Sequence, residues 1–416
     1  MTKTGFNRQE NGATFRVAPL IPFYAMALAL LGYMVWLVPG NYHEIESSRI
    51  VPADTPPENI FNYLKGLSKD ERTALIARER SNFYAEPLDR SSLFNLGVLI
   101  GLEGDSEKST ALVLQVANRS FRDVGAQTTA INLSIAKKNF SGALFHMDGL
   151  LRSRPEFAKS FYPLILSMSL EKDGLAATAK MLATAPPWRR LFMEFATQQT
   201  DQKSVVYSIL SALRDMKAEV LLTELRSFIQ QLFKSKDFET AYFIWLDFLS
   251  PAELSKVGSL YDTGFDLPVN NLGYGWNFLP VDNSELKIVT KTNVGSDFAL
   301  NIHFSSLKKL FPTVSQYVRL DPGTYHFSGE VKTEQLVSPA GLNWRIACVD
   351  TPVQIGVSPT LLENGPWKLF EFNFTVPIEN CGTQALYLTW ASAAALDRVV
   401  DGTISFDNLQ IEKLVE

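Results

Sequence analysis

The chain has 416 residues, of which 20% are charged and 12% are aromatic, and its formal net charge is −5. Lysine and arginine are scattered along it, which argues against a nucleic-acid partner because phosphate binding needs a clustered basic patch. The aromatic content excludes a chain that is disordered throughout, and the length is sufficient for two folded domains.

An uncharged run occupies residues 17–38 and reads VAPLIPFYAMALALLGYMVWLV. About 20 helical residues cross the hydrocarbon core of a bilayer, and the run is too long for a barrel strand. Pro19 and Pro22 fall in the first turns, where a missing amide donor costs least. Tyr33 and Trp36 lie near the far end, where aromatic rings favour the membrane interface. We therefore expect a single transmembrane helix at 17–38.

The charges around this run predict its orientation. Lys3, Arg8 and Arg16 precede it, whereas acidic residues predominate between the run and residue 57. The positive-inside rule then places the tail 1–16 in the cytoplasm and the rest of the chain on the far side, which in a bacterial inner membrane is the periplasm. A cleaved signal peptide is the alternative, but its apolar region is normally about 7–15 residues and ends at a small-x-small site.

Residues 39–57 form a proline-containing tether without periodicity, and residues 58–259 have a helical pattern. Segments such as 203–216 and 219–233 place apolar residues three and four positions apart, as one face of a helix requires. We expect a helical domain over 58–259.

A short motif recurs in this domain. Lys-Asn-Phe-Ser-Gly-Ala at 138–143 returns as Lys-Asp-Gly-Leu-Ala-Ala at 172–177 and as Lys-Asp-Phe-Glu-Thr-Ala at 236–241, which gives a period of about 33 with one decayed copy. The pattern resembles a degenerate tetratricopeptide repeat (TPR) over 90–250, although the Trp and Tyr of the consensus first helix are not evident. The resemblance implies stacked helix pairs with a concave surface for proteins or extended polymers. A helical domain without repeats is the alternative.

From residue 260 the pattern changes to alternation of apolar and polar residues in short runs. Examples are 298–304, 324–333, 367–376 and 403–413, separated by turn sequences such as Asp-Pro-Gly and Asn-Gly-Pro. Seven to nine such runs predict an antiparallel β-sandwich over 260–416.

Several segments of this domain carry a resemblance. Leu-Asp-Pro-Gly-Thr-Tyr at 320–325, Gly-Phe-Asp at 264–266, Gly-Tyr-Gly-Trp at 273–276 and the final run at 402–411 are similar to the galactose-binding-like jelly rolls of carbohydrate-binding modules. The resemblance implies a jelly roll and a structural calcium ion with Asp266 and Asp407 among its ligands. Calcium takes six to eight oxygens, so a simple surface or turn acid is the alternative role for Asp407. No other cofactor is expected.

The chain contains two cysteines, Cys348 and Cys381. In an oxidising compartment two cysteines most simply pair with each other, and the four histidines show no spacing typical of metal ligands. We expect a disulfide bond between them.

The domain also offers aromatic and amide side chains of the kind that bind sugars. Aromatic rings contact the C–H faces of sugars, and amides bind their hydroxyl groups. The candidates are Trp276, Trp344, Trp367, Tyr325 and Asn343, with Trp390, Tyr387 and Gln354 as further members of the set. The alternative is that the tryptophans belong to the core, because a sandwich buries such rings in any case.

No nucleophile elbow, zinc-protease motif or phosphate-binding glycine loop is present in the sequence. We therefore expect a non-catalytic, membrane-anchored periplasmic protein that assists exopolysaccharide or capsule assembly or export, with the helices docking protein partners and the sandwich contacting polysaccharide. One alternative is a protein–protein scaffold of a secretion or division complex. A second is a carbohydrate-active enzyme whose acids are not recognised.

Overall fold

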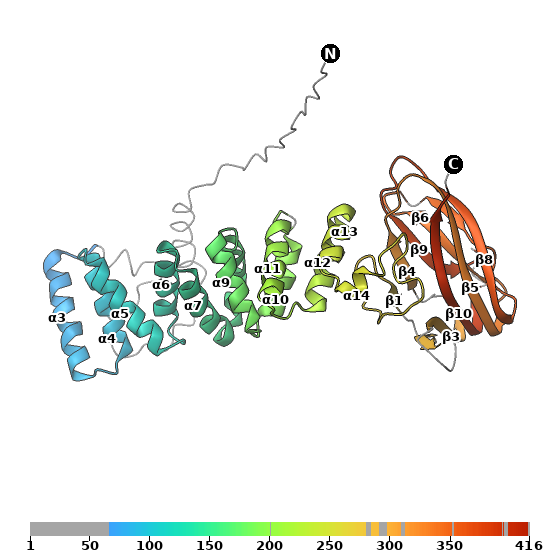
Figure 1. Cartoon of the computed structure of the whole chain (residues 1–416). Helices are drawn as coiled ribbons and strands as arrows, with labels where there is room; N and C mark the ends of the chain where they lie inside the picture. Colours follow the sequence, from blue (N-terminus) through green and yellow to red (C-terminus); the bar gives the residue numbers. More distant parts are fainter. Residues whose placement is uncertain are drawn as a thin grey trace, which may run out of the picture. The chain divides into compact units, whose positions relative to one another are not determined.

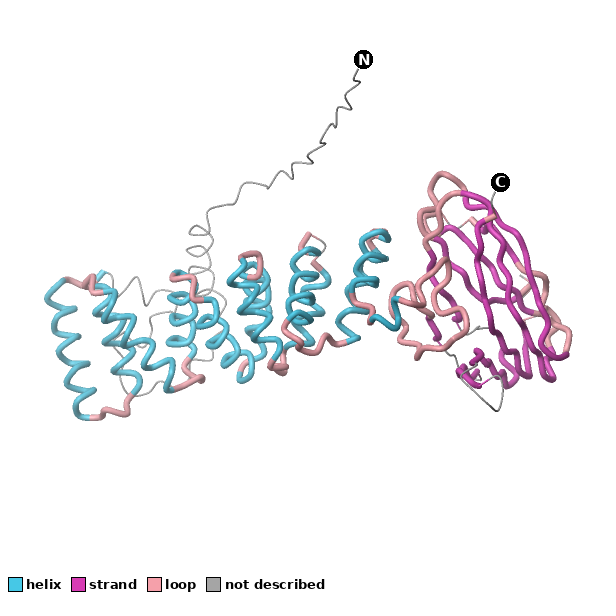
Figure 2. Tube along the Cα trace, in the orientation of Figure 1, coloured by secondary structure: helices cyan, strands magenta, loops and turns pink. Residues whose placement is uncertain are grey.

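The computed structural model of the chain forms helices followed by strands (Figures 1 and 2). It describes residues 66–199, 201–279, 284–290, 298–308, 313–351, 353–392, 394 and 398–414. The tail, the predicted transmembrane helix and the tether lie outside these residues. Within the described ranges, no helix has the length and apolar character needed to cross a bilayer. The chain divides into two compact units, Met1–Arg189 and Arg190–Glu416.

The described part of the first unit consists of helices joined by short turns. They are α3 (Lys69–Ala85), α4 (Arg90–Leu102), α5 (Ser106–Arg119), α6 (Val124–Ala136), α7 (Phe140–Ser153), the 3-10 turn η2 (Pro155–Phe157), α8 (Ala158–Met168) and α9 (Lys172–Ala183). Asp89, Asp105, Asp123 and Asn139 each begin a helix by accepting backbone N–H groups of its first turn, which satisfies donors that have no partner inside the helix.

The second unit begins with further helices: α10 (Arg189–Gln198), α11 (Lys203–Asp215), α12 (Leu222–Lys234), α13 (Phe238–Asp247) and the short α14 (Pro251–Leu254). In α11 and α12 the buried residues recur three and four positions apart. The helical prediction for this region is thus confirmed over the described residues.

The recurring motif lies at the start of α7, α9 and α13. Its last residue is buried in each copy, with Ala143 and Ala241 at 0% exposure and Ala177 at 8%, so a larger side chain would not fit there. Lys138 and Lys236, the first residues of two copies, have positive φ angles of 54° and 58° where the chain turns. The motif therefore marks equivalent turns, while its assignment to the TPR family stays a prediction.

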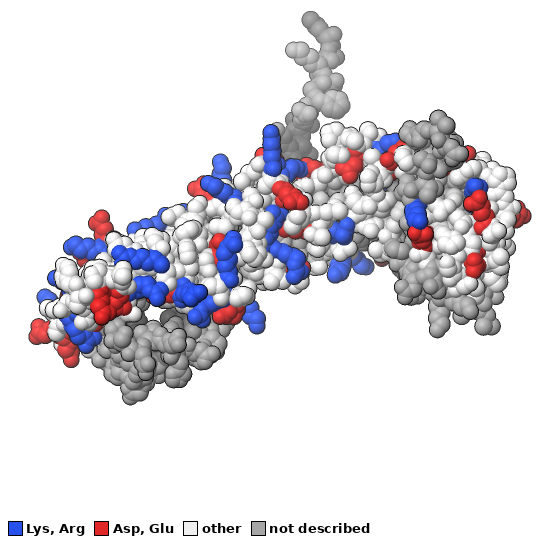
Figure 3. Space-filling model, turned by 90° about the horizontal axis from the view of Figure 1, so that it is seen from below, with Lys and Arg blue, Asp and Glu red and all other residues white. Residues whose placement is uncertain are grey.

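The period of about 33 residues also appears in surface ion pairs. Among the described residues, charged side chains 31 to 34 positions apart meet at Arg72–Glu103, Lys138–Glu171, Lys203–Asp237 and Arg214–Asp247. Exposed ion pairs contribute about 0–1 kcal/mol each to stability. These pairs are therefore a sign of the repeated geometry and contribute little to its stability. Figure 3 shows basic and acidic side chains interspersed over the helices, as the sequence predicts.

The strands form two antiparallel five-stranded sheets. Sheet A contains, in order, β1 (Asn277–Leu279), β4 (Thr313–Val318), β9 (Gln384–Trp390), β6 (Leu342–Cys348) and β7 (Gln354–Val357). Sheet B contains β2 (Ser284–Thr290), β3 (Phe298–Lys308), β10 (Val399–Lys413), β5 (Gly323–Val337) and β8 (Gly365–Val376). The predicted antiparallel sandwich is thereby confirmed.

Aromatic rings fill the space between the sheets. The indole of Trp344 in β6 meets the ring of Phe406 in β10 at 5.2 Å in an edge-to-face arrangement, and the indole of Trp276 lies 6.1 Å away. Rings in this arrangement attract each other beyond the gain from burial. The core therefore joins one sheet to the other through side chains from both.

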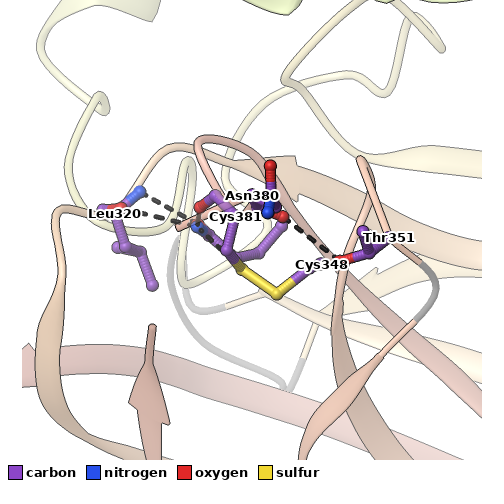
Figure 4. The surroundings of a disulfide bond; sticks show 6 residues. Leu320, Cys348, Thr351, Asn380 and Cys381 are labelled. Atoms are coloured by element: carbon purple, nitrogen blue, oxygen red, sulfur yellow. Dashed lines mark hydrogen bonds between the residues drawn. A yellow bond between two sulfur atoms is a disulfide. The ribbon is translucent and has the colours of Figure 1, made fainter. Parts of the chain in front are cut away.

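A disulfide bond staples the end of β6 to the segment before β9 (Figure 4). Cys348 and Cys381 are bonded, with their Cα atoms 4.9 Å apart, which confirms the predicted pairing. The buried side chain of Gln384 supports this region: its Oε1 accepts the amide of Leu320 at 3.0 Å, and its Nε2 donates to the carbonyl of Cys381. The disulfide bond therefore closes a loop between the ends of the neighbouring strands β6 and β9.

Candidate functional site

The outward face of sheet A is the candidate site. In β6 and β9 the residues alternate between the core and the surface, and the core positions are held by Leu342, Trp344, Ile346, Leu386, Leu388 and Trp390. The intervening residues therefore point outward: Asn343, Arg345 and Ala347 from β6, and Ala385, Tyr387 and Thr389 from β9. We call Asn343, Arg345, Tyr387, Thr389 and Ser315 of β4 the sheet A platform.

Strand pairing sets the order of the platform residues. Ser315 of β4 lies opposite Tyr387 of β9, which lies opposite Arg345 of β6. Directly opposed residues on one face of an antiparallel pair have Cβ atoms about 4.5–5.5 Å apart. With Asn277 of β1 and Val357 of β7 the row crosses all five strands, a span of about 19 Å at the usual strand spacing. Its geometry suits an extended ligand lying across the strands.

Charge separates the two sheets. Among the described strand residues of sheet A, Arg345 is the one charged side chain. The strands of sheet B carry both signs, with the carboxylates Glu285, Glu330, Glu334, Glu371, Asp401, Asp407 and Glu412. Sheet A thus presents an aromatic and amide surface without carboxylates in its strands.

The Arg345 guanidinium is held by neutral oxygens. Its Nε donates to Oδ1 of Asn343 at 3.1 Å, and its Nη2 donates to the carbonyl of Trp390 at 2.9 Å. These bonds fix the planar group beside the half-buried ring of Tyr387. The platform therefore combines one aromatic ring, one oriented cation, the hydroxyl groups of Ser315 and Thr389, and the buried amide of Asn343.

Part of the same sheet face is covered by the helices of the second unit. Tyr317 of β4 points outward, and its ring centroid lies 4.6 Å from that of Phe233 in α12. Burial raises the pKa of the Tyr317 hydroxyl, as expected for a phenol taken out of water. The platform lies one residue pair further along the strands, starting at Ser315 and Tyr387.

Most aromatic candidates from the sequence lie in the core instead. Trp344 and Trp276 are at 0% and 2% exposure, and the Tyr325 ring stacks on Phe374 while its hydroxyl donates to the carbonyl of Asp321. Trp344 and Tyr325 occupy inward positions of β6 and β5, and Trp276 directly precedes β1. All three side chains are buried, so their rings contact other protein side chains. In this structure these three rings are not open to a ligand.

The remaining candidates divide between the two sheets. Trp367 is half-buried on β8, the edge strand of sheet B, and so belongs to the other sheet from the platform. Asn343 belongs to the platform, and so do Tyr387 and, at its margin, Gln354. Arg345 was not among the candidates, although its position two residues after Asn343 in a β-strand already predicts that it shares the face of Asn343.

The acidic candidates occur in different surroundings. The Asp266 carboxylate pairs with Nζ of Lys256 at 2.5 Å, whereas Asp407 is fully buried in β10 and accepts the amide of Asn408. Across the described residues, no group of three or more acidic, histidine or cysteine side chains is placed to hold a metal ion. The calcium ion stays a prediction.

A second hollow lies inside the second unit, where α13 and the segment 257–261 meet β4. It is lined by Tyr242, Trp245, Tyr274, Tyr317 and Arg319, among others. The Arg319 guanidinium lies 5.5 Å from the Tyr242 ring centre and pairs with Glu239 at 2.8 Å. Burial raises the pKa of Tyr274 to about 12. The Arg319 cation is already paired with Glu239, and the rings of Tyr242 and Tyr317 pack on Tyr274. These contacts connect the helices to the sandwich within the second unit.

Comparison with known proteins gives a structural likeness only. No protein-family model matches the chain, and no curated protein matches it. The sandwich resembles a family 4 carbohydrate-binding module, with 16% identity over 34% of this chain and 88% of the module at a TM-score of 0.26. A xylan-binding family 22 module from Paenibacillus barcinonensis shares 15% identity over 34% of this chain and 87% of its own, also at 0.26. A family 61 module in complex with β-1,4-galactotriose shares 14% sequence identity over 38% of this chain and 99% of the module, at a TM-score of 0.26.

Proposed function

We propose that the β-sandwich binds a polysaccharide chain on the sheet A platform. The observation that supports this most directly is the placement of Tyr387 beside Arg345 on a sheet face whose strands carry no carboxylate. A tyrosine ring offers an apolar surface to the C–H face of a sugar, while its neighbours offer hydrogen bonds to hydroxyl groups. Thr389 stands in the next row, opposite Asn343, and adds a hydroxyl group to the set of polar partners. The Asn343 side chain is buried and orients the Arg345 guanidinium.

The whole protein then acts as a non-catalytic accessory factor of exopolysaccharide or capsule assembly or export. The predicted helix at 17–38 anchors it in the inner membrane with the N-terminus in the cytoplasm. The disulfide bond supports a periplasmic location for the sandwich, because such bonds persist in oxidising compartments.

The TPR-like helices dock protein partners in this proposal. Phe121 and Phe145 of the first unit form an edge-to-face pair, with ring centres 5.3 Å apart and exposures of 37% and 47%. Exposed aromatic pairs are typical of surfaces that contact other proteins. This pair is the docking point that we would examine first.

Affinity electrophoresis tests the sugar-binding proposal. The full chain, purified in a detergent without sugar groups, is run through gels that contain xylan, β-glucan, alginate or polygalacturonate. We expect at least one of these to retard the protein, and Tyr387→Ala to weaken that retardation about tenfold, or about 1.4 kcal/mol. The matched control is Tyr84→Ala, which removes an exposed ring from α3 and leaves retardation unchanged.

Two results would favour the other functions. Absence of retardation by every polysaccharide, with the fold verified by circular dichroism, contradicts sugar binding and favours a protein–protein scaffold of a secretion or division complex. Turnover of a labelled polysaccharide, lost on substitution of one acid, identifies an enzyme instead.

A further inference from the structure

We infer that the polysaccharide bound by the sheet A platform is acidic, with a uronate carboxylate that pairs with Arg345. This inference rests on the proposed function and names the class of ligand for the same site. It starts from a positive charge that has no carboxylate partner in the part of the chain that the structure describes.

Arg345 has no carboxylate partner among the described residues. Its contacts are the Asn343 amide oxygen and the carbonyls of Trp390 and Ala391, at 3.1, 2.9 and 3.5 Å. These bonds use Nε and Nη2, whereas a guanidinium carries five N–H donors over three nitrogens. The donors of Nη1 therefore remain for a ligand, on a side chain whose orientation is fixed by its contacts with the described residues.

The opposite sheet treats its outward cations differently. Lys332 of β5 pairs with Glu334 at 2.8 Å, and Lys287 of β2 pairs with Glu285 at 2.6 Å. Residues 260–416 also contain more acidic than basic side chains. Among the described strand residues of sheet A, however, the charged side chain is a cation, Arg345. Such an unpaired and partly buried charge gains most from an incoming anion.

Strand pairing places this cation where a sugar substituent would reach it. Tyr387 and Arg345 are directly opposed in β9 and β6, so their Cβ atoms lie about 4.5–5.5 Å apart. A sugar ring stacked on Tyr387 would therefore carry its carboxylate toward the guanidinium. Guanidinium and carboxylate are planar groups that match in a two-bond pair, which an ammonium group does not reproduce.

Polygalacturonate and its fully methyl-esterified form provide the test, because they share one backbone and differ in charge. Binding of the full chain to each is measured by affinity electrophoresis at low and at 0.5 M salt. We expect the acid form to bind at least tenfold more tightly than the ester at low salt, and this preference to shrink at high salt because salt screens the pair.

Charge variants locate the effect. Arg345→Gln should remove the preference for the acid form, and Arg345→Lys should restore only part of it. Lys332→Gln removes the same charge from the outward face of sheet B and should leave the preference intact. If Arg345→Gln fails to fold, the comparison of acid and ester on the unmodified chain still decides the question.

Two results would overturn the inference. Equal binding of acid and ester, or tighter binding of neutral xylan, shows that the platform binds sugar without reading charge, so that the proposed function stands and the inference fails. Loss of the preference in Lys332→Gln assigns the cation to sheet B. If no polysaccharide binds at all, both the proposed function and the inference fail.

Discussion

At the residue scale, adjacent positions of one strand have opposite roles. Trp344 is fully buried between the sheets, whereas its neighbours Asn343 and Arg345 face outward. Removing the indole of Trp344 would leave a large cavity against Phe406 and Trp276. Arg345 contributes to the surface, whereas Asn343 is buried on the outer side of the sheet and orients Arg345.

We predict that Trp344→Ala lowers the free energy of unfolding by about 3–5 kcal/mol, as for other buried aromatic residues replaced by alanine. Trp367→Ala, at a half-buried position on the edge strand β8, should cost no more than about 1 kcal/mol. Urea unfolding followed by circular dichroism measures both. Similar small losses for the two variants would mean that Trp344 is not the core residue described above.

The sequence predicts alternation in the strands but not which set of alternating residues faces inward. In 342–348 one alternating set contains Trp344, which suits either a core or a sugar site. The other set contains Asn343 and Arg345, which suit a sugar site. The choice is made by the opposite sheet, where Phe406 and Phe327 pack on the indole. Those contacts come from strands distant in sequence, so local pattern alone could not separate core from site.

At the element scale, the disulfide bond constrains the end of β6 relative to the start of β9. Its two cysteines are 33 residues apart, and closing a loop of this size in the unfolded chain corresponds to about 3–4 kcal/mol. We predict that the double variant Cys348→Ser, Cys381→Ser loses about this amount of stability.

Urea unfolding with and without a strong reductant measures this effect. The reductant should lower the stability of the unmodified chain by a similar amount and leave the double variant unchanged. If the reductant has no effect on the unmodified chain, the bond does not contribute to stability in the way described.

The sequence predicts which regions are helical and which form strands, because apolar residues recur with a period of 3.6 in helices and 2 in strands. The recurring helical motif ends in an alanine, which is fully buried in two copies as Ala143 and Ala241. What could not be predicted is the pairing of strands, since β4 pairs with β9 and β3 with β10 across long stretches of chain. The platform depends on that pairing, because the pairing places Arg345 of β6 opposite Tyr387 of β9.

At the scale of the whole molecule, the last helices and the sandwich share one compact unit. Arg226 of α12 donates to the carbonyls of Asn270 and Asn271, and the Tyr274 hydroxyl donates to the carbonyl of Phe238 in α13. The sequence pattern changes at 259/260, whereas the compact division falls at 189/190. The local sequence pattern shows where helices end and strands begin. It does not predict the tertiary contacts that join the last helices to the sandwich.

The central claim is that the sheet A platform is the surface that meets polysaccharide. Hydroxyl-radical footprinting of the full chain, with and without the polysaccharide that retards it most, tests this without altering any residue. We expect oxidation of Tyr387 to fall at least threefold on binding, while that of Leu369, exposed on sheet B, stays constant. Protection of Leu369 or Trp367 with Tyr387 unchanged would place the binding surface on sheet B and rule out the sheet A platform.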